Sequence, residues 1–578
     1  MLRKLLIAAV LATLVSTTVA SAAGRRHVHS QQVSISTTQL MPGVTYTREV
    51  DFTAAGPVVL DVVTIPKPDG TVYSLAPVLS NETLTGTETL THIEQRVGSA
   101  ATTVGIDGDY FSKASGQPSG ILMRGGVLDS QPNPARTSLG IAPDGTLNIG
   151  QVAYTGTWQG SAGLRPVSLN TRTGKFTLFT PSFGTATPAE SNVTEIVFSS
   201  FPATHPSQAL DGTVAQVAAT GGQRIPQGGA VLVARGSANS AQLKAEAPVG
   251  QTVEVRLTLT PDWSGLASAI GGGPLLVKKG KAVFSDGESF LPGELNSREA
   301  RGAIGQTADG HILLVTVEGA SPAYSVGLSS YELAVQMVKL GATTAIGLGS
   351  GGPAGLAFNG SLLTRPSGTS EAPVSDALVL SYSGVYASPV APVLSPNGDG
   401  VSDTETFSYR VVRPSTVTET LTGPGGATVQ LGSGAEQPGV YTLTWNGESG
   451  TGTTLEPEGS WTFTVTATDD RHVTTTAQRA FSLDDTLASL TLSLGSRGVP
   501  TANFTLTRQA SITLRVERPN GIPLATLKTP TEQPGPVHMT WKWFTGKRAP
   551  AGRYQLRVQA TSSVGVSSLV AGFSFSGH

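Results

Sequence analysis

The fold is decided by a stretch that reads Arg301-Gly-Ala-Ile304-Gly305, then Asp309-Gly310, then Leu313-Leu-Val-Thr-Val317. Asp-Gly between two apolar runs predicts a β-hairpin, because this dipeptide favours the tight turns that join antiparallel strands. The same unit occurs earlier, where Arg136-Thr-Ser-Leu139-Gly140 precedes Asp144-Gly145 at the same spacing. Each unit opens with an arginine. Two arginines that face one cleft would form an anion site, and otherwise each is merely structural.

A helix is predicted after the second hairpin. Ser329-Ser330-Tyr331-Glu332 forms a capping box, in which the two end side chains satisfy each other's backbone amides. An apolar stripe with helical spacing follows at Leu333, Ala334, Met337, Val338 and Leu340. Gly341 predicts the end of this helix. A strand over residues 343–348 comes next.

A second helix is predicted near 91–97, with Leu90, Ile93 and Val97 on one face. The remaining pattern consists of short apolar runs between turn residues, and the chain contains 69 glycines and 37 prolines. We therefore expect an α+β, strand-rich domain of catalytic type over residues 43–386.

Two glycine-rich segments interrupt this domain, at Ile270-Gly271-Gly-Gly-Pro274 and at Gly347-Leu-Gly349-Ser350-Gly351-Gly352-Pro353. The second is superficially similar to a nucleotide-binding turn. A dinucleotide site needs a helix directly after the glycines, whereas Leu356-Ala-Phe-Asn359-Gly360 predicts a strand that enters a hairpin. We therefore exclude a dinucleotide site there.

An acidic turn is the first candidate for chemistry. It reads Gly105-Ile-Asp107-Gly-Asp109-Tyr110-Phe111 and is followed by Gly116-Gln-Pro118-Ser-Gly120. Carboxylates at the end of a strand can transfer protons or bind a metal ion. The alternative is an Asp-rich turn with no chemistry.

The N-terminus predicts secretion. Arg3 and Lys4 precede an uncharged apolar stretch and the small residues Ala20 and Ala22, which is the order of a secretory signal peptide. We expect the signal over residues 1–22, cleavage before Ala23, and a polar leader over 23–42. The localisation predicted is secreted, in the cell envelope or outside the cell.

Composition limits the possible partners. Charged residues make up 13 % of the chain, about half of the usual 25 %. The net charge of −2 becomes −4 when Arg3 and Lys4 leave with the signal. Nucleic acid is therefore a poor partner, and no later segment is apolar enough to span a membrane. A secreted chain without cysteine suggests a bacterial protein. The oligomeric state cannot be predicted.

Two all-β modules are predicted after a proline-rich joint, over residues 387–485 and 486–578. Glu436-Gln437-Pro438-Gly439 leads to Trp445, and Glu532-Gln533-Pro534-Gly535 leads to Trp541. Polar and apolar residues alternate around Trp461 and around Tyr554, as in half-buried strands. The size suits immunoglobulin-like sandwiches, with the aromatic residues in their cores.

The order of these motifs resembles the phosphodiester glycosidase family, which includes the mannose-6-phosphate uncovering enzyme. The resemblance covers about 85–382, from the acidic turn to the strand near Asp376. It implies hydrolysis of an N-acetylglucosamine-1-phosphodiester between sugar and phosphate, with no cofactor required. The C-terminal modules resemble Ig-like repeats related to the flagellar hook-capping protein. In the first of them, Asn397, Asp399 and Asp403 predict either a structural Ca²⁺ site or a plain Asx-capped turn.

The resemblance also implies site residues. The expected catalytic carboxylates are Asp107, Asp109 and Glu318. The expected contacts to sugar and phosphate are Arg136, Arg301, Tyr110, Gly351 and Gly352.

This sequence departs from the family at several of these positions. Asp107 stands where the family usually has Asn, and Glu318 where it usually has Asp. Ala320 replaces an Arg, and Gly349 replaces the Asp of the glycine-rich loop.

Three functions follow as hypotheses. The first is a secreted hydrolase that cleaves a sugar-1-phosphodiester in cell-envelope glycans, with a glycan or sugar phosphodiester as its partner. The second is a catalytically degenerate carbohydrate- or cell-wall-binding protein on the same fold. The third is an adhesin in which the β modules do the work.

Overall fold

The computed structural model describes residues 34–283, 287–398, 400–449, 454–494, 500–519, 523–540 and 551–575. The predicted signal peptide, Asp399 and Trp541 lie outside these residues. Within them, no helix combines the length and apolar character that crossing a bilayer requires.

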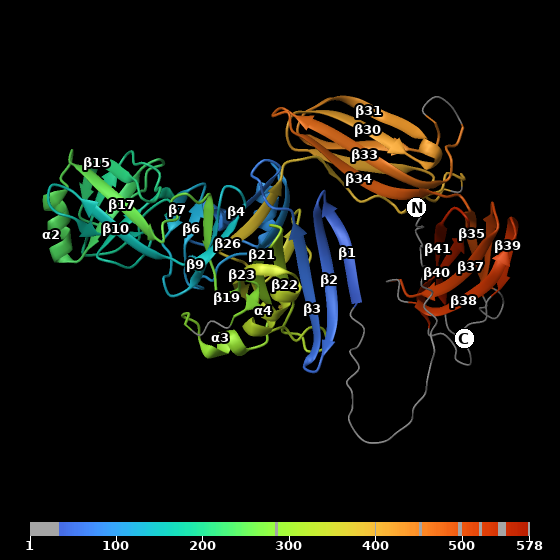
Figure 1. Cartoon of the computed structure of the whole chain (residues 1–578), viewed down its shortest axis with the longest axis horizontal. Helices are drawn as coiled ribbons and strands as arrows, with labels where there is room; N and C mark the ends of the chain where they lie inside the picture. Colours follow the sequence, from blue (N-terminus) through green and yellow to red (C-terminus); the bar gives the residue numbers. More distant parts are fainter. Residues whose placement is uncertain are drawn as a thin grey trace, which may run out of the picture.

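Two antiparallel sheets face each other across the main core of the large domain (Figure 1). The first, sheet A, has the order β1 (Ser34–Met41), β2 (Val44–Thr53), β3 (Gly56–Ile65), β22 (Ile312–Val317), β21 (Arg301–Thr307), β23 (Ala342–Ser350), β19 (Leu275–Lys278) and β20 (Lys281–Ala282). The second, sheet B, has the order β25 (Ser361–Leu362), β24 (Leu356–Phe358), β5 (Thr102–Asp107), β26 (Asp376–Tyr382) and β4 (Tyr73–Leu79). Strand β1 extends the domain into the predicted leader, so the boundary at residue 43 falls too late.

Helices cover the outer faces of both sheets. Helix α4 (Ser330–Lys339) packs on sheet A through Leu333, Ala334 and Met337. Its predicted capping box is confirmed: Ser329 accepts from the Glu332 amide, and Glu332 accepts from the Ser329 amide. Helix α1 (Leu90–Val97), also predicted, packs on sheet B. The short α3 (Pro292–Asn296), which leads toward β21, was not predicted.

A third sheet forms a wall between two hydrophobic cores. Sheet E has the order β7 (Val127–Ser130), β6 (Leu122–Arg124), β18 (Ser268–Gly271), β8 (Thr137–Ile141) and β9 (Leu147–Gln151). Leu122 and Ile270 belong to the main core, whereas their neighbours Met123 and Ala269 belong to a second core. This alternation follows from the two-residue period of a strand.

The second core belongs to an inserted lobe over residues 153–260, seen at the left of Figure 1. Its sheet has the order β11 (Arg165–Pro166), β10 (Ala153–Gln159), β17 (Thr252–Thr260), β15 (Ala209–Ala218), β14 (Val193–Phe198), β16 (Ala230–Arg235), β13 (Phe176–Phe179) and β12 (Ser168–Leu169), with α2 (Ser237–Glu246) beside it. Ala153 pairs with Thr260, so the lobe begins and ends on neighbouring strands. The sequence analysis did not anticipate this lobe.

The repeated arginine units form the two predicted hairpins, β8–β9 and β21–β22. They also contact each other. Gln306 of the second hairpin donates to the Gly145 carbonyl, and its side-chain oxygen accepts from the Leu147 amide. The contact brings the two repeats together within one core.

Each C-terminal module is a pair of antiparallel-rich sheets. The first contains β27 (Tyr386–Ala387), β29 (Glu405–Val411) and β32 (Gly439–Trp445) facing β28 (Val393–Leu394), β34 (Thr474–Leu483), β33 (Gly459–Asp469), β30 (Ser415–Thr422) and β31 (Thr428–Glu436). The second contains β35 (Leu487–Leu494), β36 (Pro500–Leu506) and β39 (Gly535–Thr540) facing β38 (Pro523–Glu532), β37 (Ala510–Glu517), β40 (Gly552–Thr561) and β41 (Val566–Phe575). Trp445, Trp461 and Tyr554 are buried in these cores, as predicted.

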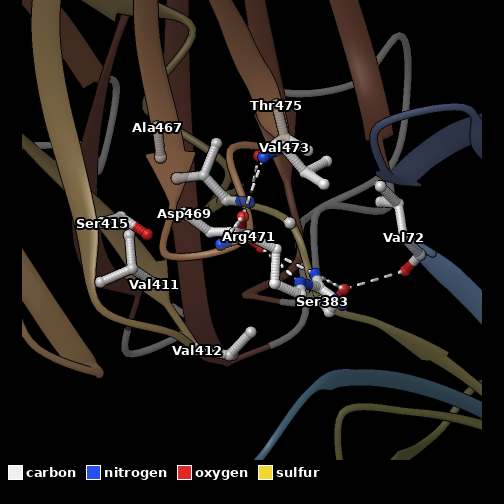
Figure 2. Close-up of a pocket in the computed structure, with 12 residues that line it drawn as sticks. Val72, Ser383, Val411, Val412, Ser415, Ala467, Asp469, Arg471, Val473 and Thr475 are labelled. Carbon is white, nitrogen blue, oxygen red and sulfur yellow. Dashed lines mark hydrogen bonds and ion pairs between the residues drawn. The ribbon is translucent and has the colours of Figure 1, made fainter.

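The first module docks on the large domain through arginine side chains. Figure 2 shows Arg471 beside Ser383, to whose hydroxyl it donates a hydrogen bond. Arg471 also donates to the Thr71 carbonyl. Asp469 pairs with the same guanidinium at 2.7 Å and holds it in place. Arg410 makes a second link, donating to the carbonyls of Gly98 and Ala101.

Candidate functional site

Three carboxylates meet at one end of sheet B. Asp107 is the last residue of β5, and Asp109 follows on the turn. Asp376 begins the neighbouring strand β26, where Ala377 pairs with Asp107. All three are buried, with at most 4 % of each residue exposed. The sequence analysis predicted the first two as site residues and missed Asp376, whose signal was an acidic residue at the start of an apolar strand.

Backbone amides hold these carboxylates in place. The Asp109 amide donates to Asp376 Oδ1 at 2.7 Å, and the Gly120 amide donates to Asp109 Oδ2 at 2.6 Å. Asp107 Oδ1 accepts from the Gly355 amide at 3.1 Å. Its Oδ2 is buried and has no partner among the described residues, so one carboxylate oxygen is left for another interaction.

Glycines of the other sheets make room for Asp107 and Asp109. A Cβ at Gly302 would lie 2.7 Å from Asp107 Oδ1, and one at Gly349 would lie 2.5 Å from Asp107 Oδ2. A Cβ at Gly271 would lie 2.3 Å from Asp109 Oδ2. These separations are shorter than van der Waals contact. The absence of a side chain at these three glycines therefore makes room for the two carboxylates.

Burial favours the protonated form of the cluster. It raises the pKa of Asp109 to about 8, and the negative charge of Asp376 adds to the rise. Burial likewise raises the pKa of Asp376 to about 6 and that of Asp107 well above its usual range. Asp109 and Asp376 share one environment, so they titrate as a pair. The cluster therefore holds at least one proton at neutral pH.

The two repeated arginines lie near Tyr110, on the same turn. The Arg136 guanidinium lies 5.0 Å from the Tyr110 ring centre and 4.1 Å from that of Phe290. Burial raises the pKa of Tyr110 to about 12, against the opposing positive charges of Arg301 and Arg136. The Arg136 charge also lowers the pKa of Asp109. Both arginines and the acidic turn thus form one site.

The two arginines differ in how they are held. Buried Arg301 donates to the carbonyls of Leu328, Glu294 and Ser297, and it pairs with Glu299 at 3.0 Å. Arg136 is half-buried, and only its Nε makes a hydrogen bond among the described residues, to the Ser289 carbonyl. Arg136 therefore has more of its guanidinium left for an anion.

The predicted glycine contacts lie beside Arg301. Gly351 donates its amide to the Ala300 carbonyl at 2.8 Å and has a φ of +73°, which favours glycine. Gly352 lines a small pocket together with Glu371 and Thr364. Their neighbour Ser350 pairs with Arg301 across the β21–β23 ladder and hydrogen-bonds Tyr110.

Glu318 lies in a neighbouring cluster. Its contacts among the described residues are with Arg48 at 3.3 Å, with the Arg365 amide at 2.8 Å, and with Asp61 and Tyr324. Burial raises the pKa of Asp61 to about 7. No described hydrogen bond or ion pair joins Glu318 to Asp107 or Asp109, and a joint catalytic role of the three carboxylates stays a prediction.

The candidate Ca²⁺ turn is closed by hydrogen bonds. Asp403 accepts from the Gly398 amide at 2.8 Å and from the Gly400 amide at 2.7 Å. The side-chain amide of Asn397 donates to Ser395 Oγ. These are the interactions of an Asx-capped turn, the alternative that the sequence left open. Asp399 lies outside the described residues, and the Ca²⁺ site stays a prediction.

A family model described as phosphodiester glycosidase matches residues 205–381. This segment contains Arg301, Glu318 and the glycine-rich loop, and the predicted resemblance is confirmed over it. Comparison with curated proteins gives no match.

Comparison with solved structures gives matches to proteins from two bacteria and a fish. A protein of Synechocystis has a TM-score of 0.52 and 24 % identity, over 61 % of this chain and 64 % of that chain. This chain thus spans less than two thirds of that relative, and the likeness concerns the fold alone. A protein of Burkholderia pseudomallei has a TM-score of 0.45 and 24 % identity, over 56 % and 74 % of the two chains.

The third structure is the catalytic domain of zebrafish N-acetylglucosamine-1-phosphodiester alpha-N-acetylglucosaminidase, auto-inhibited by its pro-peptide. It has a TM-score of 0.31 and 13 % identity, over 62 % of this chain and 85 % of that chain.

Proposed function

We propose that this protein is a secreted hydrolase that cleaves a sugar-1-phosphodiester bond of the N-acetylglucosamine-1-phosphodiester type in cell-envelope glycans. The observation that carries the proposal is the juxtaposition of a proton-holding carboxylate cluster with two arginines around Tyr110. The family match over 205–381 supports it.

In this reaction Arg136 and Arg301 hold the phosphate, because a guanidinium donates paired hydrogen bonds to phosphate oxygens. The phosphate is the leaving group and departs readily, so the demand for proton donation is small. Asp109 supplies a proton when one is needed, since its raised pKa keeps it protonated near neutral pH. The raised pKa of Asp107 favours its neutral carboxyl group, whose unpartnered Oδ2 accepts a hydrogen bond from the sugar.

A second candidate function is carbohydrate binding without catalysis. The carboxylates of Asp109 and Asp376 accept backbone amides and are closed to solvent, which also suits a purely structural role. Gly349 stands where the family usually has Asp, which favours the same alternative.

Hydrolysis by the purified chain tests the proposal. The substrate is an aryl N-acetylglucosamine-1-phosphodiester, and the readout is released N-acetylglucosamine. Arg136→Ala should lower kcat/KM by about 10- to 10²-fold, since a charge-assisted bond contributes roughly 1.5–3 kcal/mol. Arg256→Ala, an exposed arginine of the lobe paired with Glu254, is the matched control and should act as the wild type does. No release by the folded wild type would favour the binding alternative.

A further inference from the structure

A groove of about 510 Å³ lies between the acidic-turn loop and the inserted lobe. One wall is the loop around Ser112 and Ser119, a second is 130–134, and the third is 169–173 of the lobe. Its volume is within the range of small-molecule sites, about 300–1,000 Å³.

The groove lies next to the candidate site, because the backbone segments that line the groove are bonded to those that carry the site residues. The Ser119 amide donates to the Tyr110 carbonyl at 2.8 Å, and the next amide, of Gly120, holds Asp109. On the second wall, the Asn133 carbonyl accepts from the Arg136 amide at 3.1 Å. A molecule in the groove therefore lies beside the segments that carry Asp109, Tyr110 and Arg136.

The lobe wall is fixed to the core by a buried asparagine. Asn170 is fully buried, with its side-chain amide donating to the Asp129 carbonyl and the Thr180 hydroxyl. Its own carbonyl accepts from Gln117 of the opposite wall at 2.6 Å. This bond ties two walls together, so the groove is formed before any ligand enters.

The lining of the groove is polar and almost uncharged. It consists mainly of Ser, Thr, Gln, Asn and Pro, and the only charged side chain among the lining residues is Arg172. Gln131 Nε2, Asn133 Nδ2 and the Ser119 hydroxyl have no hydrogen-bond partner in the part of the chain that the structure describes. Such donors can form hydrogen bonds with the hydroxyl and acetamido oxygens of a sugar. The proline rings can make apolar contacts with the C–H faces of sugar rings.

We infer that this groove binds the glycan chain that continues from the scissile bond, which makes it a specificity site of the proposed hydrolase. The inference rests on the proposed function for its substrate. The groove itself recognises a polyhydroxylated chain, whether neutral or carrying phosphate. Arg172 lies where it would pair with a phosphate of the chain.

Titration calorimetry on the purified protein tests this site without any cleavage. One probe is a neutral tetramer of N-acetylglucosamine, and the other is poly(glycerol phosphate), which carries the anionic repeat. Ser112→Trp, at an exposed position, fills the groove, and Ser161→Trp, exposed on the lobe away from the groove, is the matched control. We expect one probe or both to bind, Ser112→Trp to weaken binding at least tenfold, and Ser161→Trp to leave it unchanged.

Arg172→Ala separates the two kinds of chain. Weaker binding of the phosphate polymer alone would indicate an anionic glycan, and equal binding would indicate a neutral one. Absence of binding by both probes, or binding that Ser112→Trp leaves intact, would overturn the inference. Glycan binding without phosphodiester hydrolysis would reject the proposed reaction but support glycan binding in the groove. Failure of the proposed reaction is therefore distinguishable from failure of the proposed binding site.

Discussion

At the scale of single residues, the site depends on glycines that leave space for the buried carboxyl groups. The carboxylate of Asp107 occupies the space next to Gly302 and Gly349. The family resemblance puts Asn at position 107 and Asp at position 349, so in this chain the carboxylate has moved from one side of the contact to the other. The site therefore keeps one carboxyl group at this point.

This exchange predicts a coupling between positions 107 and 349. Gly349→Asp should destabilise the fold, because it adds a Cβ 2.5 Å from Asp107 Oδ2 and a second negative charge. Asp107→Asn in the same chain should recover about 1–3 kcal/mol of that loss, the usual range for directly coupled residues. Urea unfolding of the two single variants and the double variant measures it. Gly349→Asn adds a side chain of the same size without the charge, so it separates the steric effect from the electrostatic one. If the losses of unfolding free energy in the two single variants simply add in the double variant, positions 107 and 349 are not coupled.

The Asp109–Asp376 pair predicts how stability changes with pH. The pKa of Asp109 is higher in the folded state, at about 8, than in the unfolded chain, near its ordinary value of 3.8. The folded state therefore binds more protons between these values. The stabilisation is complete below about pH 4 and is lost as pH rises through 8, with a slope of up to about 1.4 kcal/mol per pH unit.

Asp109→Asn should flatten this slope. Its absolute stability should be lower at every pH, since asparagine cannot accept the amides of both Tyr110 and Gly120. Urea unfolding between pH 5 and pH 8.5 gives the comparison. Asp211→Asn, on an exposed stretch of β15, is the control and should keep the wild-type slope. An unchanged slope in Asp109→Asn would show that the pair is ionised in the folded protein.

At the scale of elements, helix α4 supports the site through its N-terminus. The Leu328 carbonyl, one residue before the Ser329 cap, accepts from Arg301 Nε at 2.8 Å. Ser329→Ala should cost about 1 kcal/mol of unfolding free energy and also raise KM for the phosphodiester by loosening Arg301. Ser199→Ala, in an exposed loop of the lobe, is the control for stability and KM. A loss of stability with an unchanged KM would show that the Ser329 cap does not position Arg301.

The elements that the sequence predicted are those with strong local signals. The capping box predicted α4, and the Asp-Gly turns predicted both arginine hairpins, because each of these patterns spans only a few consecutive residues. The inserted lobe was missed since its boundary is a pairing of Ala153 with Thr260, which no local pattern reveals. Asp376 was missed for a related reason, because strand order decides which side chains share a cluster.

At the scale of the whole molecule, the first β module is held to the large domain by few contacts. Arg410 and Arg471 carry most of the described hydrogen bonds across the joint, to carbonyls at Gly98, Ala101 and Thr71 and to the Ser383 hydroxyl. The chain between the two parts is short, because β26 ends at Tyr382 and β27, which belongs to the module, begins at Tyr386. Tyr386 packs in the main core of the large domain, and Ala387 packs in the core of the module. The orientation of the module therefore depends on the two arginines and on this shared strand.

Replacing both arginines with alanine should release the module. Limited proteolysis should then cut the joint at residues 383–385 several-fold faster, because removing these bonds frees the backbone around Ser383. Hydrolysis of the small aryl substrate should not change. Arg413→Ala, whose partners Asp469 and Asp470 lie within the module, is the control. Equal cleavage rates would mean that packing alone fixes the joint.

The pairing of Ala153 with Thr260 has a consequence for how this protein arose and how it can be altered. A segment whose two ends sit side by side can be gained, lost or exchanged without reconnecting the strands around it. The lobe thus has the geometry of an insertion, and it carries one wall of the groove while the acidic turn and both arginines lie outside it. Natural variants of this architecture could change the chain they accept by exchanging the lobe and keep the same chemistry beneath it.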